Sequence, residues 1–504
     1  MMDVKDVQCS SHTSLARAMV KTLYDKRTNK IQNVCKRDKS KMVEGLVYKL
    51  ARFVNPTATN SHRTQKEQIV YAAQLKELIC GLEASQKDER FNRKVGCEAD
   101  MDRFKHWLVD NGTECDLVDI RQSKDERFGV FSMNAAIAEG EKVISVPLRV
   151  IMTSEPSTDT LARLSHDPLL QSDDSCLLSM RILDEFNNPQ SFWKPYLDIL
   201  PTAFDGLPIL CSDLQQFADT SIMDLAVDSL TILARHYVHL FIMLSRMNVD
   251  TSRFTWASFL WARCIAMTRQ NQIQIVTKSG EPRMALCLIP LYDMFNHKAG
   301  PITTCFDPKL NRLETLAPRA ISPYQQIYIA YGNRSNQHLM CFSGFVDVTN
   351  TDNDRIRLWI ALPDDKVKHN RCKLLDSLRI PSQGYFELGP PPVSATSEKL
   401  IVFLRVMLMD QNELDTLLAI RDERHLHETL LKPHGISKDC DERVWGWIKL
   451  RCIILKSKLA ARDSRLKSSE LTATNLADSS NAVKIRFVEY SLLSLIERQD
   501  SIIN

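Results

Sequence analysis

The stretch Leu288-Ile289-Pro290-Leu291-Tyr292-Asp293-Met294-Phe295-Asn296-His297 carries the strongest indication of fold in this chain. An apolar run predicts a strand over Met284–Pro290, and a short turn after it ends in the adjacent pair Asn296 and His297. A buried asparagine and histidine at a turn often do no more than satisfy nearby backbone groups. Alone, the stretch therefore favours a structural and a functional interpretation about equally.

A second stretch, Ile327-Tyr328-Ile329-Ala330-Tyr331-Gly332-Asn333-Arg334-Ser335-Asn336, lies further along the chain. It predicts another strand, which ends at Tyr331 just before a glycine. A tyrosine in this position places its hydroxyl group at the edge of a sheet, where a cleft can form. A tyrosine that only packs at the end of the sheet would give the same pattern, so the two stretches are specific only together.

The apolar spacing divides the whole chain into alternating blocks of helix and strand. Strands are predicted at Phe128–Met133, Lys142–Val146, Met284–Pro290, Ile302–Phe306, Arg312–Ala317, Gln326–Ile329 and Arg355–Ala361, and helices at Met42–Phe53, Ile69–Leu82, Ile222–Leu244, Thr255–Arg269, Leu400–Met409, Leu414–Ile420, Val444–Leu459 and Val483–Ile496. Two blocks of strands separated by helices indicate one sheet domain with an insertion, followed by a helical domain.

We therefore predict an α+β protein with three parts. Residues 1–95 form a helical, partly flexible N-terminal region. Residues 96–350 form a β-rich domain that a helical insertion at about 155–255 splits in two. Residues 351–504 form an all-helical C-terminal domain.

Composition excludes several classes of protein. Apolar residues make up 44% of the 504 residues and charged residues 25%, as in ordinary globular proteins. The net charge of +3 is nearly balanced, so we expect no nucleic-acid partner, because such proteins usually carry a strongly basic surface. The most apolar segment, Leu225–Met247, contains Asp228, Arg235 and Arg246, so we expect a buried helix there and no membrane span. Oligomeric state has no sequence pattern here; a monomer is expected.

Targeting and metal binding are judged from the N-terminus and the cysteines. The N-terminal residues lack the apolar core of a signal peptide, and Lys36–Lys41 is a short basic run, so we expect a cytoplasmic protein with a possible nuclear pool. The fourteen cysteines include no CxxC pair, which predicts free thiols and no zinc cluster. The pairs His236/His239 and His425/His427 have no fitting third ligand nearby, so no metal is expected.

The two stretches together resemble the pair of motifs of SET-domain methyltransferases, in which two segments thread past each other at the active site. The block Asp125-Glu126-Arg127-Phe128-Gly129-Val130 is similar to the family's first cofactor-contacting turn, with Arg127 where glycine is common. The phrase Ser191-Phe192-Trp193-Lys194-Pro195-Tyr196, the insertion and the helical C-terminal region resemble the Rubisco-methyltransferase-like branch, whose C-terminal domain binds the protein substrate.

Within that branch, several segments are similar to the actin-histidine methyltransferases. These segments are Met267–Ile273, Tyr328–Asn336, Ser343–Phe345, Pro391–Ser394 and Phe403–Val406, and the resemblance extends over roughly Cys97 to Ile496. It implies an enzyme that uses S-adenosyl-L-methionine to methylate a ring nitrogen of a histidine in actin.

Matching positions imply the roles of individual residues. The cofactor site would contain Glu126, Phe128, Arg269, Asp293, Met294, Phe295, Asn296, His297, Ser343, Gly344 and Phe345. Asn271 and Tyr331 would be catalytic and would contact the substrate together with Tyr292 and Arg334. Tyr292 stands where the family has a tryptophan, and an N-terminal arginine of the cofactor site has only Arg90 and Arg93 as candidates.

Elementary chemistry explains why such residues suit a histidine substrate. A free imidazole with a pKa near 6.5 is mostly neutral at cytosolic pH, whereas a lysine with a pKa of about 10.4 must first lose a proton. The imidazole must keep its proton on one nitrogen so that the other nitrogen presents a lone pair. The amide oxygen of Asn271 could accept that proton's hydrogen bond and select this tautomer.

Two alternatives remain open on the sequence. One is a lysine methyltransferase of the same branch, against which Asn271 and its surroundings Met267–Ile273 count. The other is a non-catalytic module that binds actin or another protein, against which the retention of Asn296, His297 and Tyr331 counts.

Overall fold

The computed structural model describes residues 38–55, 63–86, 98–122, 128–276, 280–432, 434–468, 471–476 and 479–500. The chain forms two compact units that alternate along the sequence. The first unit comprises Met1–Ser61, Val70–Asp205 and Asp228–Gly332, and the second comprises His62–Ile69, Gly206–Val227 and Asn333–Asn504. These units are groups of residues that contact one another, and they do not test the domain boundaries predicted from sequence, which stay predictions.

The first unit has a large helical part, most of it between its strands. Its helices are α2 (Asp38–Val54), α3 (Gln65–Gln86), α4 (Glu98–Asp110), α5 (Asp159–Leu164), α6 (Pro168–Ser172), α7 (Asp174–Asn187), α8 (Lys194–Ile199), α9 (Ser221–Arg246) and α10 (Trp256–Arg269), and the first turns of α3 and α9 belong to the second unit. The short 3₁₀ turns are η3 (Leu148–Val150) and η6 (Tyr292–Met294).

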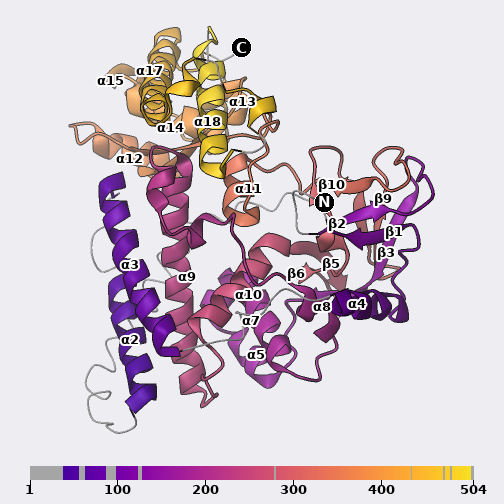
Figure 1. Ribbon diagram of the computed structural model, residues 1–504. Helices are drawn as coiled ribbons and strands as arrows, with labels where there is room; N and C mark the ends of the chain where they lie inside the picture. Colours follow the sequence, from indigo (N-terminus) through magenta and orange to yellow (C-terminus); the bar gives the residue numbers. More distant parts are fainter. Residues whose placement is uncertain are drawn as a thin grey trace. The chain divides into compact units, whose positions relative to one another are not determined.

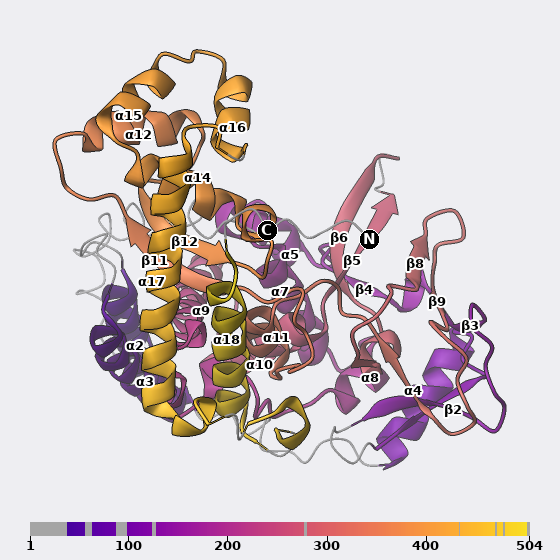
Figure 2. The ribbon, with the colours of Figure 1, turned by 90° about the horizontal axis from the view of Figure 1, so that it is seen from above.

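Helices α2, α3 and α9 run side by side in Figures 1 and 2, and specific hydrogen bonds connect them. The Arg235 guanidinium on α9 donates to the carbonyl oxygen of Val54 at the end of α2 over 2.7 Å. The Gln86 amide, at the end of α3, donates to the Tyr237 hydroxyl and accepts from the Trp256 backbone N–H, over 2.7 and 2.8 Å. Gln86 thereby ties α3 to the start of α10, where Thr255 and Ser258 form a capping box.

The strands of the first unit form three small sheets. They are β1 (Val118–Arg121), β2 (Gly129–Ser132), β3 (Lys142–Pro147), β4 (Met152–Thr153), β5 (Asn271–Val276), β6 (Pro282–Leu288), β7 (Asn296–His297), β8 (Thr304–Asp307), β9 (Arg312–Leu316) and β10 (Gln326–Ile329). The strand orders are β1-β2-β10-β7, β3-β9-β8 and β4-β6-β5. Each strand predicted from sequence in this unit overlaps an observed one. No strand was predicted at β1, β4, β5 or β7, although Asn271–Val276 of β5 alternates buried and more exposed residues toward its end.

The second unit is mostly helical, as the sequence predicts for the C-terminal region. Its elements are η4 (Pro208–Leu210), η5 (Leu214–Phe217), α11 (Asn336–Ser343), β11 (Ile356–Ala361), α12 (Lys368–Ser377), β12 (Gln383–Leu388), α13 (Val393–Thr396), α14 (Glu398–Leu408), α15 (Gln411–Leu418), α16 (Glu423–Leu431), α17 (Lys438–Arg462), η7 (Ser464–Leu466), η8 (Ala473–Asn475) and α18 (Asn481–Glu497).

An antiparallel pair of strands adds to these helices. Ile356 pairs with Leu388 and Leu358 with Phe386, so alternate residues of β11 and β12 point to the same buried side. The Phe386 ring packs on Phe403 of α14 with 4.4 Å between ring centroids. The prediction of an all-helical C-terminal domain was therefore wrong in this respect, since the domain also contains a two-stranded sheet. The sheet forms because β12 pairs with β11 and extends its buried apolar side.

A buried ion pair sits inside the helical core of the second unit. The Arg405 side chain on α14 lies 2.6 Å from the Asp441 carboxylate on α17 and also donates to the Leu430 carbonyl oxygen. A buried charge is tolerated only when it is paired and hydrogen-bonded. This pair therefore specifies how α14, α16 and α17 pack.

Among the described residues, one helix passes the length and composition test for a membrane span. It is α9, and 67% of the qualifying window is buried inside the protein. A core helix passes the same test, so α9 gives only weak evidence for a membrane.

A neutral acid caps the start of α9 in the second unit. The Ser221 backbone N–H donates to the Glu489 carboxyl oxygen of α18 over 2.9 Å, and Glu489 is 4% exposed. Burial, together with the nearby acids Asp354 and Asp224, raises the pKa of Glu489 to about 8. Glu489 is therefore mostly protonated near neutral pH.

Replacement of this acid by its amide should change how stability depends on pH. Because the pKa in the folded protein lies above the ordinary glutamate value of 4.5, the unfolded chain loses this proton at lower pH, and stability falls as pH rises toward 8. The slope from this group approaches about 1.4 kcal/mol per pH unit. In Glu489→Gln, the free energy of unfolding measured with denaturant should fall less between pH 5 and pH 8. The exposed control Glu428→Gln should behave as the wild type, and equal slopes in Glu489→Gln and wild type would refute this role.

Candidate active site

The candidate site of the first unit is organised by two strands that lie side by side. Strand β10 pairs with β7 in parallel, so that Tyr328 is opposite Asn296 and Ile329 is opposite His297. This pairing brings together the two stretches that the sequence singled out.

Tyr331 strengthens the junction just after β10 ends. Its backbone N–H donates to the His297 ring nitrogen Nδ1 over 3.1 Å, and its hydroxyl donates to the Phe295 carbonyl oxygen over 2.8 Å. Since Nδ1 accepts a hydrogen bond, the proton of a neutral His297 sits on Nε2. Both the tautomer of His297 and the position of the Tyr331 ring are therefore set by the strand crossing.

The start of β2 lies against the same junction. The Asn296 side-chain amide donates to the Phe128 carbonyl oxygen over 3.0 Å. A Cβ atom at Gly129 would lie 2.6 Å from the Gln326 amide nitrogen and 3.2 Å from that of Asn296. Only glycine fits at residue 129 without displacing these side chains, which explains one residue of the block that resembles a cofactor-contacting turn.

A buried acid connects the turn after β6 to the end of α10. Arg269 donates from Nη1 to the Asp293 carbonyl oxygen over 2.7 Å, and Nη1 lies 3.6 Å from the Asp293 carboxylate. The Tyr196 hydroxyl of α8 donates to that carboxylate. Burial raises the pKa of Asp293, while Arg269 and Tyr196 oppose the rise, and burial raises the pKa of Tyr196 well above its usual value.

Tyr196 is a member of this site that the sequence did not assign. Its segment was recognised only as part of the phrase Ser191–Tyr196. The side chain is fully buried, and its partner lies far away in the sequence, so no local pattern could reveal the contact. The Asp293 oxygen Oδ1 is buried without a hydrogen-bond partner in the described part of the chain.

The turn itself holds an unusual backbone conformation. Leu291 has φ of 71°, in the left-handed region that costs a branched residue about 1–3 kcal/mol. The following Tyr292 is only 3% exposed and packs near Phe295, with 6.2 Å between ring centroids. Tyr292 thus stands as a buried aromatic wall behind the turn, and its contact with substrate stays a prediction.

Asn271 begins β5, directly opposite Cys287 of β6. Its amide nitrogen Nδ2 donates to the Arg269 carbonyl oxygen over 3.1 Å. A carbonyl oxygen can only accept, so the atom that faces it must be the NH₂ group, and Oδ1 must point the other way. The amide of Asn271 is therefore oriented so that its acceptor oxygen points away from the Arg269 carbonyl oxygen.

The remaining predicted site residues belong to the second unit or fall outside the described residues. Arg334 and Ser343–Phe345 belong to the second unit, where Asn350 donates to the Arg334 carbonyl oxygen over 2.7 Å and Gly344 ends α11 with φ of 82°. Glu126, Arg90 and Arg93 lie outside the described residues. The part of all these residues in the site stays a prediction.

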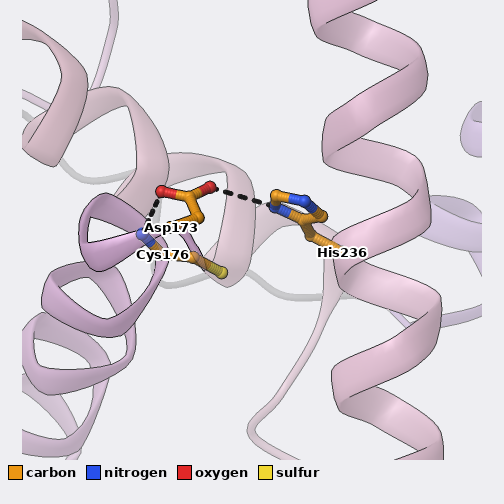
Figure 3. A group of neighbouring side chains, drawn as sticks. All are labelled: Asp173, Cys176 and His236. Atoms are coloured by element: carbon orange, nitrogen blue, oxygen red, sulfur yellow. Dashed lines mark hydrogen bonds and ion pairs between the residues drawn. The ribbon is translucent and has the colours of Figure 1, made fainter. Parts of the chain in front are cut away.

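A group of possible metal ligands occurs away from this site. Figure 3 shows Asp173 and Cys176, at the start of α7, facing His236 of α9, and their ligand atoms lie within 4.8 Å of one another. The buried Arg263 guanidinium is 3.3 Å from the Asp173 carboxylate. Burial raises the pKa of Cys176 to about 12 and lowers that of His236 to about 4, so both are neutral.

The charge at this group opposes a metal ion. A guanidinium already balances the carboxylate, and a divalent cation beside it would be repelled. A metal would also require a thiolate at Cys176. We interpret the group as a buried ion pair that joins α7, α9 and α10.

Comparisons with known proteins agree with this geometry. Residues 362–493 match the family model described as Rubisco LSMT substrate-binding. The chain is 30% identical over 416 residues to the actin-histidine N-methyltransferase of Gallus gallus, which covers 77% of this chain and 66% of that protein. The corresponding protein of Homo sapiens is 29% identical over 404 residues, with the same shares covered. The chain thus spans just under two thirds of the length of these relatives.

Solved structures show the same fold. The SET domain of LSMT bound to lysine and AdoHcy matches with a TM-score of 0.62 at 19% identity, covering 80% of this chain and 91% of that one. Rubisco LSMT bound to AdoMet matches with a TM-score of 0.59 at 19% identity, covering 79% and 90%. The chain therefore has the SET-domain fold of Rubisco LSMT, and most of its sequence is similar to actin-histidine N-methyltransferases.

Proposed function

We propose that this protein is a protein-histidine N-methyltransferase that uses S-adenosyl-L-methionine to methylate a ring nitrogen of a histidine in actin. The similarity to actin-histidine N-methyltransferases over 77% of the chain supports this proposal. The fold, which it shares with a structure bound to AdoMet, is compatible with it.

The orientation of the Asn271 amide is the observation that carries the proposal. The hydrogen bond to the Arg269 carbonyl fixes which end of the amide is the acceptor. An acceptor oxygen held in this way stabilises the imidazole tautomer whose other nitrogen presents its lone pair. A lysine side chain needs no choice of tautomer, so this arrangement favours histidine over the lysine substrate of the alternative.

The residues of the site suit the cofactor. The half-buried Arg269 guanidinium, which Asp293 holds in place, offers a positive charge to the carboxylate of the cofactor's amino-acid group. Asn296, His297 and Phe128 would hold the rest of the molecule, and Gly129 allows a close approach of the backbone. When bound, S-adenosylmethionine supplies a methyl group on a sulfonium. The protein's part is to align the acceptor nitrogen with that methyl group and exclude water.

Tyr331 would form part of the substrate wall. Because its hydroxyl donates to the Phe295 carbonyl oxygen, the ring is held in one orientation beside the turn. Because the Tyr331 ring is already fixed before binding, less conformational freedom is lost when the substrate imidazole packs against it. Tyr331 is therefore proposed as a catalytic residue that acts by position.

We also propose that the protein binds actin and acts in the cytoplasm. Among the described residues, the cysteines from Cys80 to Cys452 are free thiols, which suits a reducing compartment.

The first prediction concerns cofactor binding. The double variant Asn296→Ala/His297→Ala removes the bonds to Phe128 and Tyr331 and should abolish binding of S-adenosylmethionine in calorimetry. Circular dichroism should show a folded protein. The control Asn412→Ala, an exposed asparagine on α15, should bind as the wild type does. Unchanged affinity in the double variant would contradict the site assignment.

The second prediction separates histidine from lysine chemistry. Asn271→Ala removes the proposed hydrogen bond between the amide oxygen and the substrate imidazole. This loss of about 1–3 kcal/mol corresponds to roughly tenfold to more than a hundredfold in rate on a histidine peptide. Asn271→Phe should reduce the histidine rate further and could admit lysine. Gln274→Ala, at an exposed amide of the same strand, is the matched control. The account fails if wild type prefers a lysine peptide or if Asn271→Ala leaves the histidine rate untouched.

The third prediction is the pH dependence. Below about pH 6 the free imidazole is protonated and has no lone pair, so kcat/KM for the histidine peptide should fall. Burial raises the pKa of Asp293, so its protonation at low pH would weaken the pair with Arg269 in the same direction. Calorimetric affinity for the cofactor at each pH isolates the Asp293 contribution. A histidine rate that rises as pH drops from 7 to 5.5 would exclude a neutral imidazole as the acceptor.

A further inference from the structure

Helix α17 carries apolar side chains on two opposite sides, and one of these sides faces solvent. Val444, Trp445, Ile448, Cys452 and Leu459 are buried in the core of the second unit. On the opposite side, Leu450 is 58% exposed, Ile453 46% and Ile454 39%. Large apolar side chains that are exposed together on one side of a helix mark a surface that a partner can cover.

The exposed residues form one continuous patch, which we call the α17 face: Gly446, Trp447, Leu450, Ile453 and Ile454. Their spacing of three and four residues places them on adjacent turns of the same side. No atom lies within 4 Å of a Cβ built on Gly446, and Trp447 is partly buried. The face is therefore open at Gly446 and firmly supported at Trp447.

Basic side chains flank the α17 face. No acidic residue occurs between Arg443 and Arg462 in the sequence. By helical geometry Lys449 lies on one flank and Arg451 and Lys458 lie on the other. Two further cations of the helix are already used, since Arg443 pairs with Glu413 and Lys456 with Glu497, each at 2.5 Å.

The surroundings of Arg451 indicate a partner that carries acidic groups. Its Nε is buried with no hydrogen-bond partner in the described ranges. Burial lowers the pKa of its guanidinium, and no nearby acid opposes this. A carboxylate from a partner would balance the charge of this guanidinium.

Two other occupants fit less well. In a two-fold pairing of α17 with a second copy centred on Leu450, Lys449 and Arg451 would each approach their own counterparts, and like charges disfavour this. A membrane surface offers mobile headgroups, whereas a half-buried guanidinium fits a carboxylate held at a fixed position. The charges therefore favour a folded protein with carboxylates around an apolar centre.

We infer that the α17 face is a docking surface for the protein substrate, which it binds through an apolar patch flanked by carboxylates and separate from the reacting histidine. This inference rests on the proposed function. The match of residues 362–493 to a substrate-binding family model includes α17 but assigns no face of it. Contacts remote from the reacting group give a protein substrate an affinity that a short peptide lacks.

The test compares intact actin with a short actin peptide that contains the histidine. In Leu450→Glu/Ile454→Glu and in Lys449→Glu/Lys458→Glu, KM for intact actin should rise at least tenfold. The kcat value, KM for the peptide and calorimetric affinity for S-adenosylmethionine should be unchanged. Leu495→Glu, at a residue of α18 that is 44% exposed, is the matched control and should leave every value unchanged. Thermal unfolding verifies that each variant is folded.

Each outcome decides between the possibilities. Methylation of actin with unchanged KM in both double variants overturns the docking surface and leaves the proposed function standing. If wild type methylates neither actin nor the peptide, the proposed function fails, and direct binding of actin to wild type and variants still tests the surface. If the double variants keep their affinity for actin but no longer cosediment with phosphatidylserine vesicles, the α17 face binds a membrane, and the inference is overturned. If they keep their affinity for actin but lose a dimer seen in sedimentation velocity, the α17 face binds a second copy, and the inference is likewise overturned.

Discussion

The parallel pairing of β7 with β10 is the constraint on which the candidate site depends. Strand β7 consists of only Asn296 and His297, so it has almost no independent stability and is defined by its neighbour. Tyr331 reinforces it by donating to both the His297 ring and the Phe295 carbonyl oxygen. A shift of one residue along β10 would break these bonds together and would turn the side chains of β7 to the opposite face.

A buried polar chain connects this crossing to the helices inserted before it. Asp293 accepts from Tyr196 of α8 and pairs with Arg269 at the end of α10. Removal of Arg269 would leave the buried carboxylate without its counter-charge, which is strongly unfavourable. The insertion therefore supports the turn that carries Asn296 and His297, in addition to extending the fold. The left-handed backbone at Leu291 is held in place by the same surroundings.

Much of this arrangement could be predicted from the sequence, but not its long-range contacts. Apolar periodicity located strand β10 at Gln326–Ile329 and helix α10 from near Thr255 to Arg269, because both are local patterns. The resemblance to the SET-domain pair of motifs placed Asn296, His297 and Tyr331 together, and the pairing of β7 with β10 brings these stretches side by side. Strand β5 was missed because helix α10 runs to Arg269, just before it, and the alternation in Asn271–Val276 is short. Tyr196 was missed because its hydroxyl group meets a residue 97 positions away. The exposure of Leu450, Ile453 and Ile454 could not be predicted from the sequence either, because apolar side chains are expected to be buried.

The choice of acceptor in such a site depends on how firmly a single amide is held. A free asparagine side chain can present either its oxygen or its nitrogen to an imidazole, and it would then stabilise either tautomer. The bond from Nδ2 of Asn271 to the Arg269 carbonyl removes that freedom, and the same arginine is anchored by Asp293. The orientation of the acceptor oxygen is thus coupled through Arg269 to Asp293, the first residue of the Asp293–His297 run. In the methyltransferase proposed above, a single network of hydrogen bonds would align both the methyl donor and the nitrogen that receives the methyl group.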